Sequence, residues 1–147
     1  MTDGRVDCLS RAIESARENL CGEVTHKVIH DDTGDESYRE ELRATFPDFD
    51  VIGQPTRQGF GGAIRSAWAY VKVRPERFVF HLEDDFTFNE PIDLPAMQHV
   101  LDRNPGLVQL ALRRQPWNDA ELAAGGIVEQ HPTDYIDCSD GLADWLE

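Results

Sequence analysis

Short apolar segments alternate with amphipathic segments along most of the chain, and this alternation restricts the folds open to it. The apolar segments have the length of buried strands and comprise residues 24–30, 50–54, 77–82 and 107–112. Apolar residues recur at helical spacing in segments 7–20, 36–46, 62–73 and 95–104. Strands that alternate with helices predict an α/β layer fold, whose largely parallel sheet binds ligands at the carboxyl ends of its strands.

The net charge of the chain limits its partners. With 28 acidic and 14 basic residues among 147, the formal charge is −14. Nucleic-acid backbones and anionic membranes would be repelled, so broad contact with either is disfavoured. A phosphate-bearing ligand would be repelled as well, unless a divalent metal, nearby arginines or a helix N-terminus reverses the sign locally.

Length and cysteine content predict one folded domain in a reducing compartment. A chain of 147 residues can bury a sizeable core without cross-links. Cys8, Cys21 and Cys138 are odd in number and include no Cys-x-x-Cys pair, so neither a disulfide framework nor a zinc site is indicated. No apolar run reaches the ~18 residues of a membrane span, and residues 1–5 lack the apolar stretch of a signal peptide. We therefore expect a cytoplasmic protein.

Glu83, Asp84 and Asp85 follow the most hydrophobic of the predicted strands. Repulsion among three adjacent carboxylates must be relieved by a cation or by solvent. Side chains alternate along an extended segment, so Glu83 and Asp85 are expected to point the same way. One carboxylate can then hold a divalent metal while its neighbour accepts a hydrogen bond from a sugar hydroxyl. The alternative is a solvated acidic turn.

A second acidic cluster, at residues 31–35, ends an earlier predicted strand. Asp31, Asp32 and Asp35 can accept hydrogen bonds from a base or a ribose, because ionised carboxylates are acceptors only. The alternative is a turn followed by an N-cap for the next helix, since Asp is common in both roles. Two acidic clusters at strand ends favour a shared ligand site.

Residues 58–65 join a glycine-rich loop to a predicted helix, where free backbone N–H groups suit a phosphate. The stretch matches neither the P-loop nor the G-x-G-x-x-G pattern, and a tight turn is an equal alternative. Arg57 and Arg65 flank the loop and can offset phosphate charge. The other basic pair, Arg113 and Arg114, is better explained as surface charge.

Other residue types give weaker signals. No Ser or Cys lies in a G-x-S-x-G elbow, so no covalent nucleophile is assigned. The five histidines show no metal-ligand spacing. His30 and His81 fall within predicted strands, which favours core or supporting roles over catalysis.

The order of these parts resembles glycosyltransferase family 2, whose members have a GT-A fold. The resemblance runs from Asp7 to about Asn89 and depends on four stretches in the family's order. Residues 8–15 are similar to the family's first helix, and residues 28–35 to its strand that ends in Asp-Asp-Gly-Ser-x-Asp. Residues 59–65 are similar to the Gly and Ala-Arg pattern that opens a later helix, and residues 80–85 to the strand that ends in the Asp-x-Asp metal motif. The resemblance implies a Rossmann-like GT-A nucleotide-diphospho-sugar transferase fold, possibly truncated, with a mostly parallel central sheet flanked by helices.

By this resemblance the chain moves a sugar from a nucleoside-diphosphate-sugar donor to an unidentified acceptor hydroxyl, with inversion. The residues implied to bind the donor are Asp31, Asp32, Arg65, Glu83 and Asp84. Either of the first two would contact the base, Arg65 the diphosphate and Glu83 the ribose, while Asp85 would hold Mg²⁺ or Mn²⁺. The single domain 1–147 would divide into a nucleotide-sugar-binding part at 1–90 and a partial acceptor-side part at 91–147.

The chain departs from the family pattern in three places. The family has an apolar strand before its first helix, central in the sheet between the strands formed here by 24–30 and 77–82. Residues 2–5 are expected to be the exit loop of that strand, unless the flanking strands pair differently, and the strand itself is apparently lacking. Glu83 replaces the first Asp of the metal motif. The family's catalytic base lies on a later segment, where the candidates are Asp134, Asp137, Asp140 and Asp144.

Two other functions fit the same residues. A nucleotidyltransferase on a similar α/β frame would also use strand-end carboxylates and a metal. It would need a Lys- or Arg-rich glycine loop, where this chain has only Arg57 and Arg65. A non-catalytic acidic binding module, or a remnant, would use its carboxylates for solubility alone. Binding of nucleoside diphosphates with and without Mn²⁺ separates the three cases.

Overall fold

A computed structural model describes residues 1–112, 123, 135–137 and 143–145 of the chain. The chain divides into two compact units, Met1–Gln98 and His99–Glu147. The first unit contains both acidic clusters and every described element that bears on the site. The expected division at residue 90 into donor and acceptor parts concerns function and stays a prediction.

The first unit alternates helices and strands, which confirms the α/β fold class. Its elements are α1 (Val6–Asn19), β1 (Leu20–Cys21), β2 (Val28–Asp31), α2 (Glu36–Thr45), β3 (Asp50–Gly53), α3 (Gly59–Val71) and β4 (Ile92–Asp93). Helix α4 (Leu94–Arg103) follows β4 directly. The four predicted helices are all present, with ends shifted by at most three residues. Arg5 is the N-cap residue of α1, and Asp7 lies in its first turn.

The strands near the site are parallel. β2 pairs with β3 in a register that places Val28 opposite Asp50 and Asp31 opposite Gly53. On the other edge of β2, Thr2 forms a parallel bridge with Asp31, through bonds from the Thr2 nitrogen to the His30 oxygen (2.9 Å) and from the Asp32 nitrogen to the Thr2 oxygen (2.9 Å). The Met1 nitrogen donates to the Leu82 oxygen at 2.8 Å.

These bonds place residues 1–2 between β2 and Leu82. The exit loop was expected at residues 2–5, but Thr2 forms a strand bridge, and residues 3–5 lead into α1. The chain segments that precede the two acidic clusters are therefore held on either side of the same short piece of backbone.

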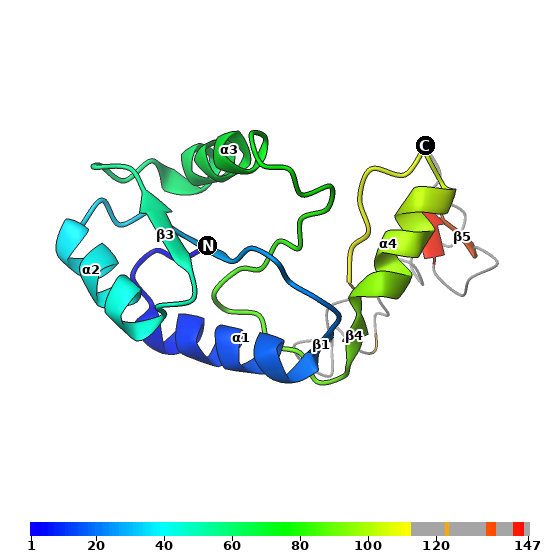
Figure 1. Ribbon diagram of the computed structural model, residues 1–147, viewed down its shortest axis with the longest axis horizontal. Helices are drawn as coiled ribbons and strands as arrows, with labels where there is room; N and C mark the ends of the chain where they lie inside the picture. Colours follow the sequence, from blue (N-terminus) through cyan, green and yellow to red (C-terminus); the bar gives the residue numbers. More distant parts are fainter. Residues whose placement is uncertain (113–122, 124–134, 138–142, 146–147) are drawn as a thin grey trace. The chain divides into compact units, whose positions relative to one another are not determined.

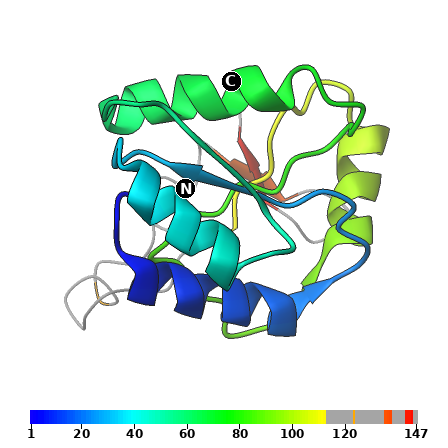
Figure 2. The same ribbon diagram turned by 60° about the vertical axis from the view of Figure 1, so that its left-hand side comes forward.

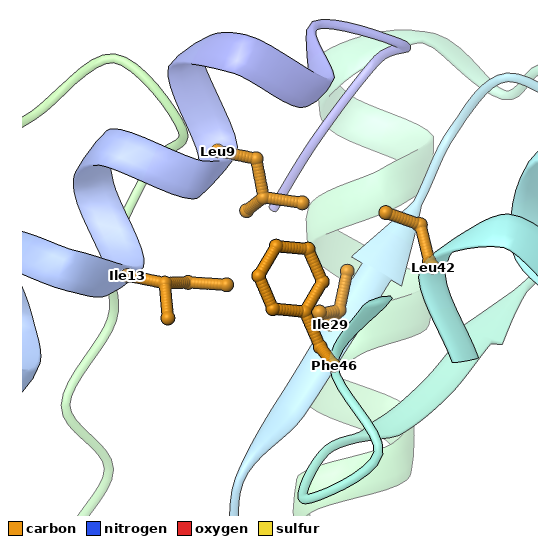
Figure 3. Close-up of a cluster of buried hydrophobic side chains, with 5 residues drawn as sticks. All are labelled: Leu9, Ile13, Ile29, Leu42 and Phe46. Carbon is orange, nitrogen blue, oxygen red and sulfur yellow. The ribbon is translucent and has the colours of Figure 1, made fainter. Parts of the chain in front are cut away.

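Helices cover both faces of the β2–β3 pair. α3 lies over one face, and α1 and α2 lie on the other (Figure 1 and Figure 2). On the α1 and α2 side, five buried side chains form the core: Leu9, Ile13, Ile29, Leu42 and Phe46. Figure 3 shows the Phe46 ring between the side chains of Leu9 and Ile13 from α1 and that of Ile29 from β2. α3 buries Ala63. This core fixes the strand ends that carry the first acidic cluster.

Two predicted strands are not formed, and this part of the sequence interpretation was wrong. Side-chain exposure alternates through residues 77–82, as in an extended chain, but among the described residues only the bond to Met1 joins this backbone to a neighbour in the manner of a sheet. Residues 107–112 also form no strand, and Val108 is 96% exposed. Apolar composition favours a strand only where a partner edge is available to accept its hydrogen bonds.

Two short pairings were not predicted. β1 pairs in parallel with β4, with Leu20 opposite Ile92. In the second unit, β5 (Tyr135–Asp137) pairs antiparallel with β6 (Ala143–Trp145). Strands of two or three residues carry too little alternation to be recognised in a sequence. Within the described residues, none of the helices is long and apolar enough to cross a bilayer.

Candidate functional site

The second acidic loop, residues 83–85, is held at both of its ends. Before it, the Leu82 oxygen accepts from the Met1 nitrogen. After it, the Ser15 hydroxyl of α1 accepts from the Phe88 nitrogen at 2.7 Å. Phe86 turns back toward the loop, with its nitrogen 3.5 Å from the Glu83 oxygen. The loop is thus fastened to the N-terminal segment on one side and to α1 on the other.

The three carboxylates of this loop differ in exposure. The side chain of Glu83 is 39% exposed and that of Asp85 is 49% exposed, while Asp84 is 2% exposed. This pattern agrees with the expectation that Glu83 and Asp85 share one side of the chain and Asp84 takes the other. Asp84 Oδ2 is buried without a hydrogen-bond partner in the described part of the chain.

A single arginine contacts the loop from the N-terminal segment. The Arg5 guanidinium bonds to Asp84 Oδ1 through Nη2 and lies 3.2 Å from Asp85 Oδ2 through Nη1. Its Nε donates to Asp3 Oδ1 at 2.9 Å. The hydrogen bonds that Arg5 donates to Asp3 and Asp85, together with the negative charge of Asp84, raise the pKa of Arg5, so the side chain is fully charged. Arg5 therefore supplies positive charge that offsets the mutual repulsion of the carboxylates at residues 83–85.

The first acidic loop is more tightly bound into the fold. Asp31 is fully buried, and its carboxylate accepts from the Thr33 nitrogen (2.9 Å), the Thr33 hydroxyl (2.9 Å) and Arg39 Nη1 (2.9 Å). Arg39, from α2, is also buried and donates to the Gln54 oxygen after β3 at 3.1 Å. Asp35 accepts from the Ser37 nitrogen at 2.9 Å and is the N-cap of α2.

Asp32 connects this loop to the segment before α3. Its Oδ1 accepts from the Gln58 nitrogen at 2.7 Å, and its Oδ2 lies 3.9 Å from Arg57 Nε. The Arg57 guanidinium in turn reaches Asp3 Oδ2 at 3.2 Å. Gln58 thus contacts the first acidic loop, and Arg57 lies between this loop and the N-terminal segment.

Alternating charges therefore run from one acidic loop to the other. The chain of ion pairs is Asp32, Arg57, Asp3, Arg5, and then Asp84 and Asp85. Within this series of ion pairs, Asp3 is the acidic residue that two arginines share, Arg57 and Arg5. The sequence predicted that the two acidic loops would share a site, and the ion pairs place them within one continuous network.

The start of α3 lies next to this network. The helix begins at Gly59, three residues earlier than expected, so the glycines form its first turn. Gln58 precedes it without a side-chain cap, which leaves the first-turn N–H groups open to a ligand. An open hollow of about 440 Å³ between β3 and α3 is lined by Gln58 and Arg65, among others. Arg65 is exposed and has no ion pair with the described residues.

Both histidines before the two loops were expected within strands, but only His30 lies in one, β2, whereas His81 lies in no strand. His30 is 3% exposed, and neither ring nitrogen has a hydrogen-bond partner among the described residues. Burial lowers the pKa of His30, so its ring is neutral at pH 7. Burial also lowers the pKa of His81, whose Nε2 lies 4.0 Å from Glu83 Oε1.

Several predicted residues fall outside what the structure describes. Asp134 is one of them. Asp137 lies in β5, where only the backbone is described. Within residues 1–112, no three His, Cys, Asp or Glu side chains converge as a ready-made metal site. The carboxylates nearest to such a role are those of residues 83–85.

Three charged residues were missed at the sequence level: Asp3 and Arg5, which belong to the network, and Arg39, which binds Asp31. Asp3 and Arg5 lie within the expected exit loop, but no motif distinguishes their side chains. Arg39 lies eight residues after Asp31 on a helix whose polar positions look like ordinary surface. The buried position of Arg39 could have been recognised if this charged residue were known to face the sheet, but the sequence alone does not give the orientation of the helix.

Comparison with known proteins adds one result. A model of the family described as Glycosyl transferase family 2 matches residues 4–135. The matched range contains both acidic loops, Arg5 and the segment that opens α3. No curated protein and no solved structure matches the chain.

Proposed function

Because the chain belongs to glycosyl transferase family 2, we propose that it transfers a sugar from a nucleoside-diphosphate-sugar donor bound between the two acidic loops. Family membership supports glycosyl transfer in general. The donor class, the metal and the residue roles are the content of the proposal.

One observation carries the proposal: the chain of ion pairs from Asp32 to Asp85 through Arg57, Asp3 and Arg5. Carboxylates of the two acidic loops and of the N-terminal segment alternate with arginine side chains along this network. A nucleoside diphosphate needs both kinds of partner, since its base and ribose donate hydrogen bonds while its phosphates accept them.

Of the two candidates for the base contact, Asp32 is the better one. Both oxygens of Asp31 are already used within the fold by Thr33 and Arg39. Within the described part of the chain, Asp32 Oδ2 has only the 3.9 Å contact with Arg57. Asp31 then supports the site by fixing the turn that presents Asp32.

On the phosphate side, the proposal assigns Arg65 and the first turn of α3 to the diphosphate. Arg65 is exposed beside the hollow between β3 and α3, and the helix start offers backbone N–H groups. Glu83, half exposed, would accept from the ribose hydroxyls. Asp84 lies behind it, buried, where it holds Arg5.

Asp85 is the proposed ligand of Mg²⁺ or Mn²⁺. Mg²⁺ commonly binds to one or two protein carboxylates together with substrate phosphates and water, so a full protein cage is not required. The half-exposed Asp85 carboxylate fits such an open site. When bound, the metal would neutralise the diphosphate as it leaves.

The proposed transfer is a single displacement. The acceptor hydroxyl oxygen bonds to the anomeric carbon as the bond from that carbon to the diphosphate oxygen breaks, and the hydroxyl proton passes to a carboxylate. Asp134 and Asp137 are the candidates for that carboxylate. Arg65 and the α3 N–H groups stabilise the negative charge that develops on the diphosphate.

Thermal unfolding with a panel of nucleoside diphosphates, each with and without Mn²⁺, tests the donor site. A ligand that binds only the native state stabilises it by about 2.7 kcal/mol at a hundred times its Kd. We expect at least one diphosphate to raise the Tm only when Mn²⁺ is present. Asp85→Asn should remove the Mn²⁺-dependent part, whereas Glu90→Gln, an exposed carboxylate five residues later, should leave it intact.

Two results would contradict the proposal. If no nucleoside diphosphate changes the Tm with or without Mn²⁺, the chain is an acidic module without a donor site. If a nucleoside triphosphate stabilises the protein much more than the matching diphosphate, nucleotidyl transfer becomes the better explanation.

A further inference from the structure

Arg5 uses its whole guanidinium on carboxylates of the site. Nη2 bonds to Asp84, Nη1 lies 3.2 Å from Asp85, and Nε lies 2.9 Å from Asp3. The three contacts are unequal. The one to Asp84 is the shortest and reaches a buried acceptor, whereas the one to Asp85 is the longest and reaches a half-exposed acceptor.

We propose that Arg5 is a built-in competitor of the divalent metal at Asp85, and that it makes metal binding depend on the diphosphate. This inference depends on the proposed function, because it concerns the same metal site. Arg5 keeps its contacts with Asp84 and Asp3 and gives up only the contact with Asp85 when the metal binds.

The charges explain why a lone metal is disfavoured. A divalent ion on Asp85 must displace Arg5 Nη1 from the same carboxylate and then lie next to a guanidinium that Asp84 and Asp3 retain. The metal ion and the guanidinium would then lie side by side, and the repulsion between these two cations opposes metal binding. Adding an anionic diphosphate next to both cations removes that repulsion, since each cation then has a new negative partner.

The anchoring contacts explain why Arg5 does not simply leave. Asp84 is 2% exposed, and its other oxygen has no partner in the described part of the chain. Without Arg5, this buried carboxylate would lose its only hydrogen-bond donor among the described residues, which is costly. Nη1, once released from Asp85, remains close to the loop and is available to a phosphate oxygen.

Isothermal titration with MnCl₂ alone tests the competition. Arg5→Gln removes the competing charge, so Mn²⁺ alone should bind about fivefold or more tightly than to the unmodified protein. The control is Arg11→Gln, which removes an arginine of α1 that contacts the Asp7 carbonyl and Cys8 but no site carboxylate. It should leave the Mn²⁺ affinity unchanged. Equal or weaker Mn²⁺ binding by Arg5→Gln would overturn the inference.

Arg5→Lys keeps the test valid if Arg5→Gln fails to fold. Its single ammonium preserves a positive charge beside Asp84 but cannot reach Asp84, Asp85 and Asp3 together. Mn²⁺ alone should then bind more tightly than to the unmodified protein, yet less tightly than to Arg5→Gln where that variant folds. Binding by Arg5→Lys no tighter than by the unmodified protein would count against the inference.

A second titration separates this inference from the proposed function. Mn²⁺ is added in the presence of the nucleoside diphosphate that stabilises the protein most. The unmodified protein should gain more Mn²⁺ affinity from the diphosphate than Arg5→Gln does. If both gain equally, only the role of Arg5 fails. If the unmodified protein binds no Mn²⁺ even with the diphosphate, the donor site itself fails, and this inference with it.

Discussion

Asp31 and Asp84 are both buried carboxylates that follow extended segments, but their surroundings differ. Asp31 accepts three hydrogen bonds at 2.9 Å, one of them from the buried Arg39. Asp84 accepts from the half-exposed Arg5 and has a second oxygen without a partner among the described residues. The first carboxylate is satisfied entirely by the fold, whereas the second is satisfied only in part.

This difference separates two uses of one residue type. A buried carboxylate with a full set of internal donors stabilises its loop and has no capacity left for a ligand. A carboxylate with spare acceptor capacity, next to an exposed neighbour such as Asp85, suits a site that exchanges partners. The internal bonds of the 31–35 loop therefore mainly fix the position of Asp32. The 83–85 loop keeps a carboxylate oxygen, Asp84 Oδ2, that has no partner among the described residues.

Removal of Arg39 should have the largest effect on stability. Arg39→Met leaves the Asp31 charge buried without its cationic partner, which should lower the free energy of unfolding by about 3–5 kcal/mol. Urea denaturation measures the change. The matched control is Arg43→Met, which removes the exposed arginine paired with Glu36 and should have little effect. Equal decreases in both variants would show that the buried Arg39–Asp31 pair contributes no more to stability than the exposed Arg43–Glu36 pair does.

The packing of the first loop gives the next largest effect. Gly34 has φ +77°, and an added Cβ would lie 2.8 Å from the Arg57 nitrogen, so Gly34→Ala combines backbone strain with a clash against main chain. We expect a loss of about 2–3 kcal/mol. Gly59 has φ +67° with nothing within 4 Å of an added Cβ, so Gly59→Ala should lose only about 1 kcal/mol. Thermal unfolding of both variants gives the comparison, and a reversed order would contradict the tight contact of the 31–35 loop with Arg57.

The histidines before the two loops should give the smallest effect, through pH. Burial lowers the pKa of His30 below its usual value of about 6.5, so the unfolded chain binds the proton more readily. The free energy of unfolding therefore decreases as the pH falls below about 6.5, because protonation of His30 favours the unfolded chain. His30→Leu should lose less stability between pH 7 and pH 5.5 than the unmodified protein.

His81→Gln provides the comparison. Burial lowers the pKa of His81 in the same direction, but its side chain is 37% exposed. The change in pH dependence should therefore be smaller than for His30→Leu. Urea midpoints at the two pH values measure both variants. If the His81 variant changes the pH dependence more, the deeper burial of His30 is not the cause.

Much of the fold could be predicted because its helices carry their own pattern. The apolar spacing of Leu9 and Ile13 predicted α1, and both residues lie in the core. The strand expected at 77–82 failed because apolar composition does not reveal whether a neighbouring edge exists. The position of residues 2–5 came from the family resemblance, and no periodicity within so short a segment could have supplied it.

The grouping of the two acidic loops could be predicted from the sequence, whereas the roles of their side chains in donor and metal binding stay predictions. Two acidic clusters at strand ends indicated that Asp32 and Asp85 belong to one region. The sequence did not reveal that Asp31 is buried against Arg39, or that Asp3 links Arg5 to Arg57. Each of these contacts joins residues far apart in the chain or on different elements, so it depends on packing that no local pattern encodes.

The backbone of Met1 and Thr2 has a consequence for ligand size. It separates β2 from Leu82 by two inter-strand spacings, or about 10 Å. Under the proposed function, we therefore expect a donor that contacts both acidic loops to be an elongated molecule, long enough to cross this backbone separation.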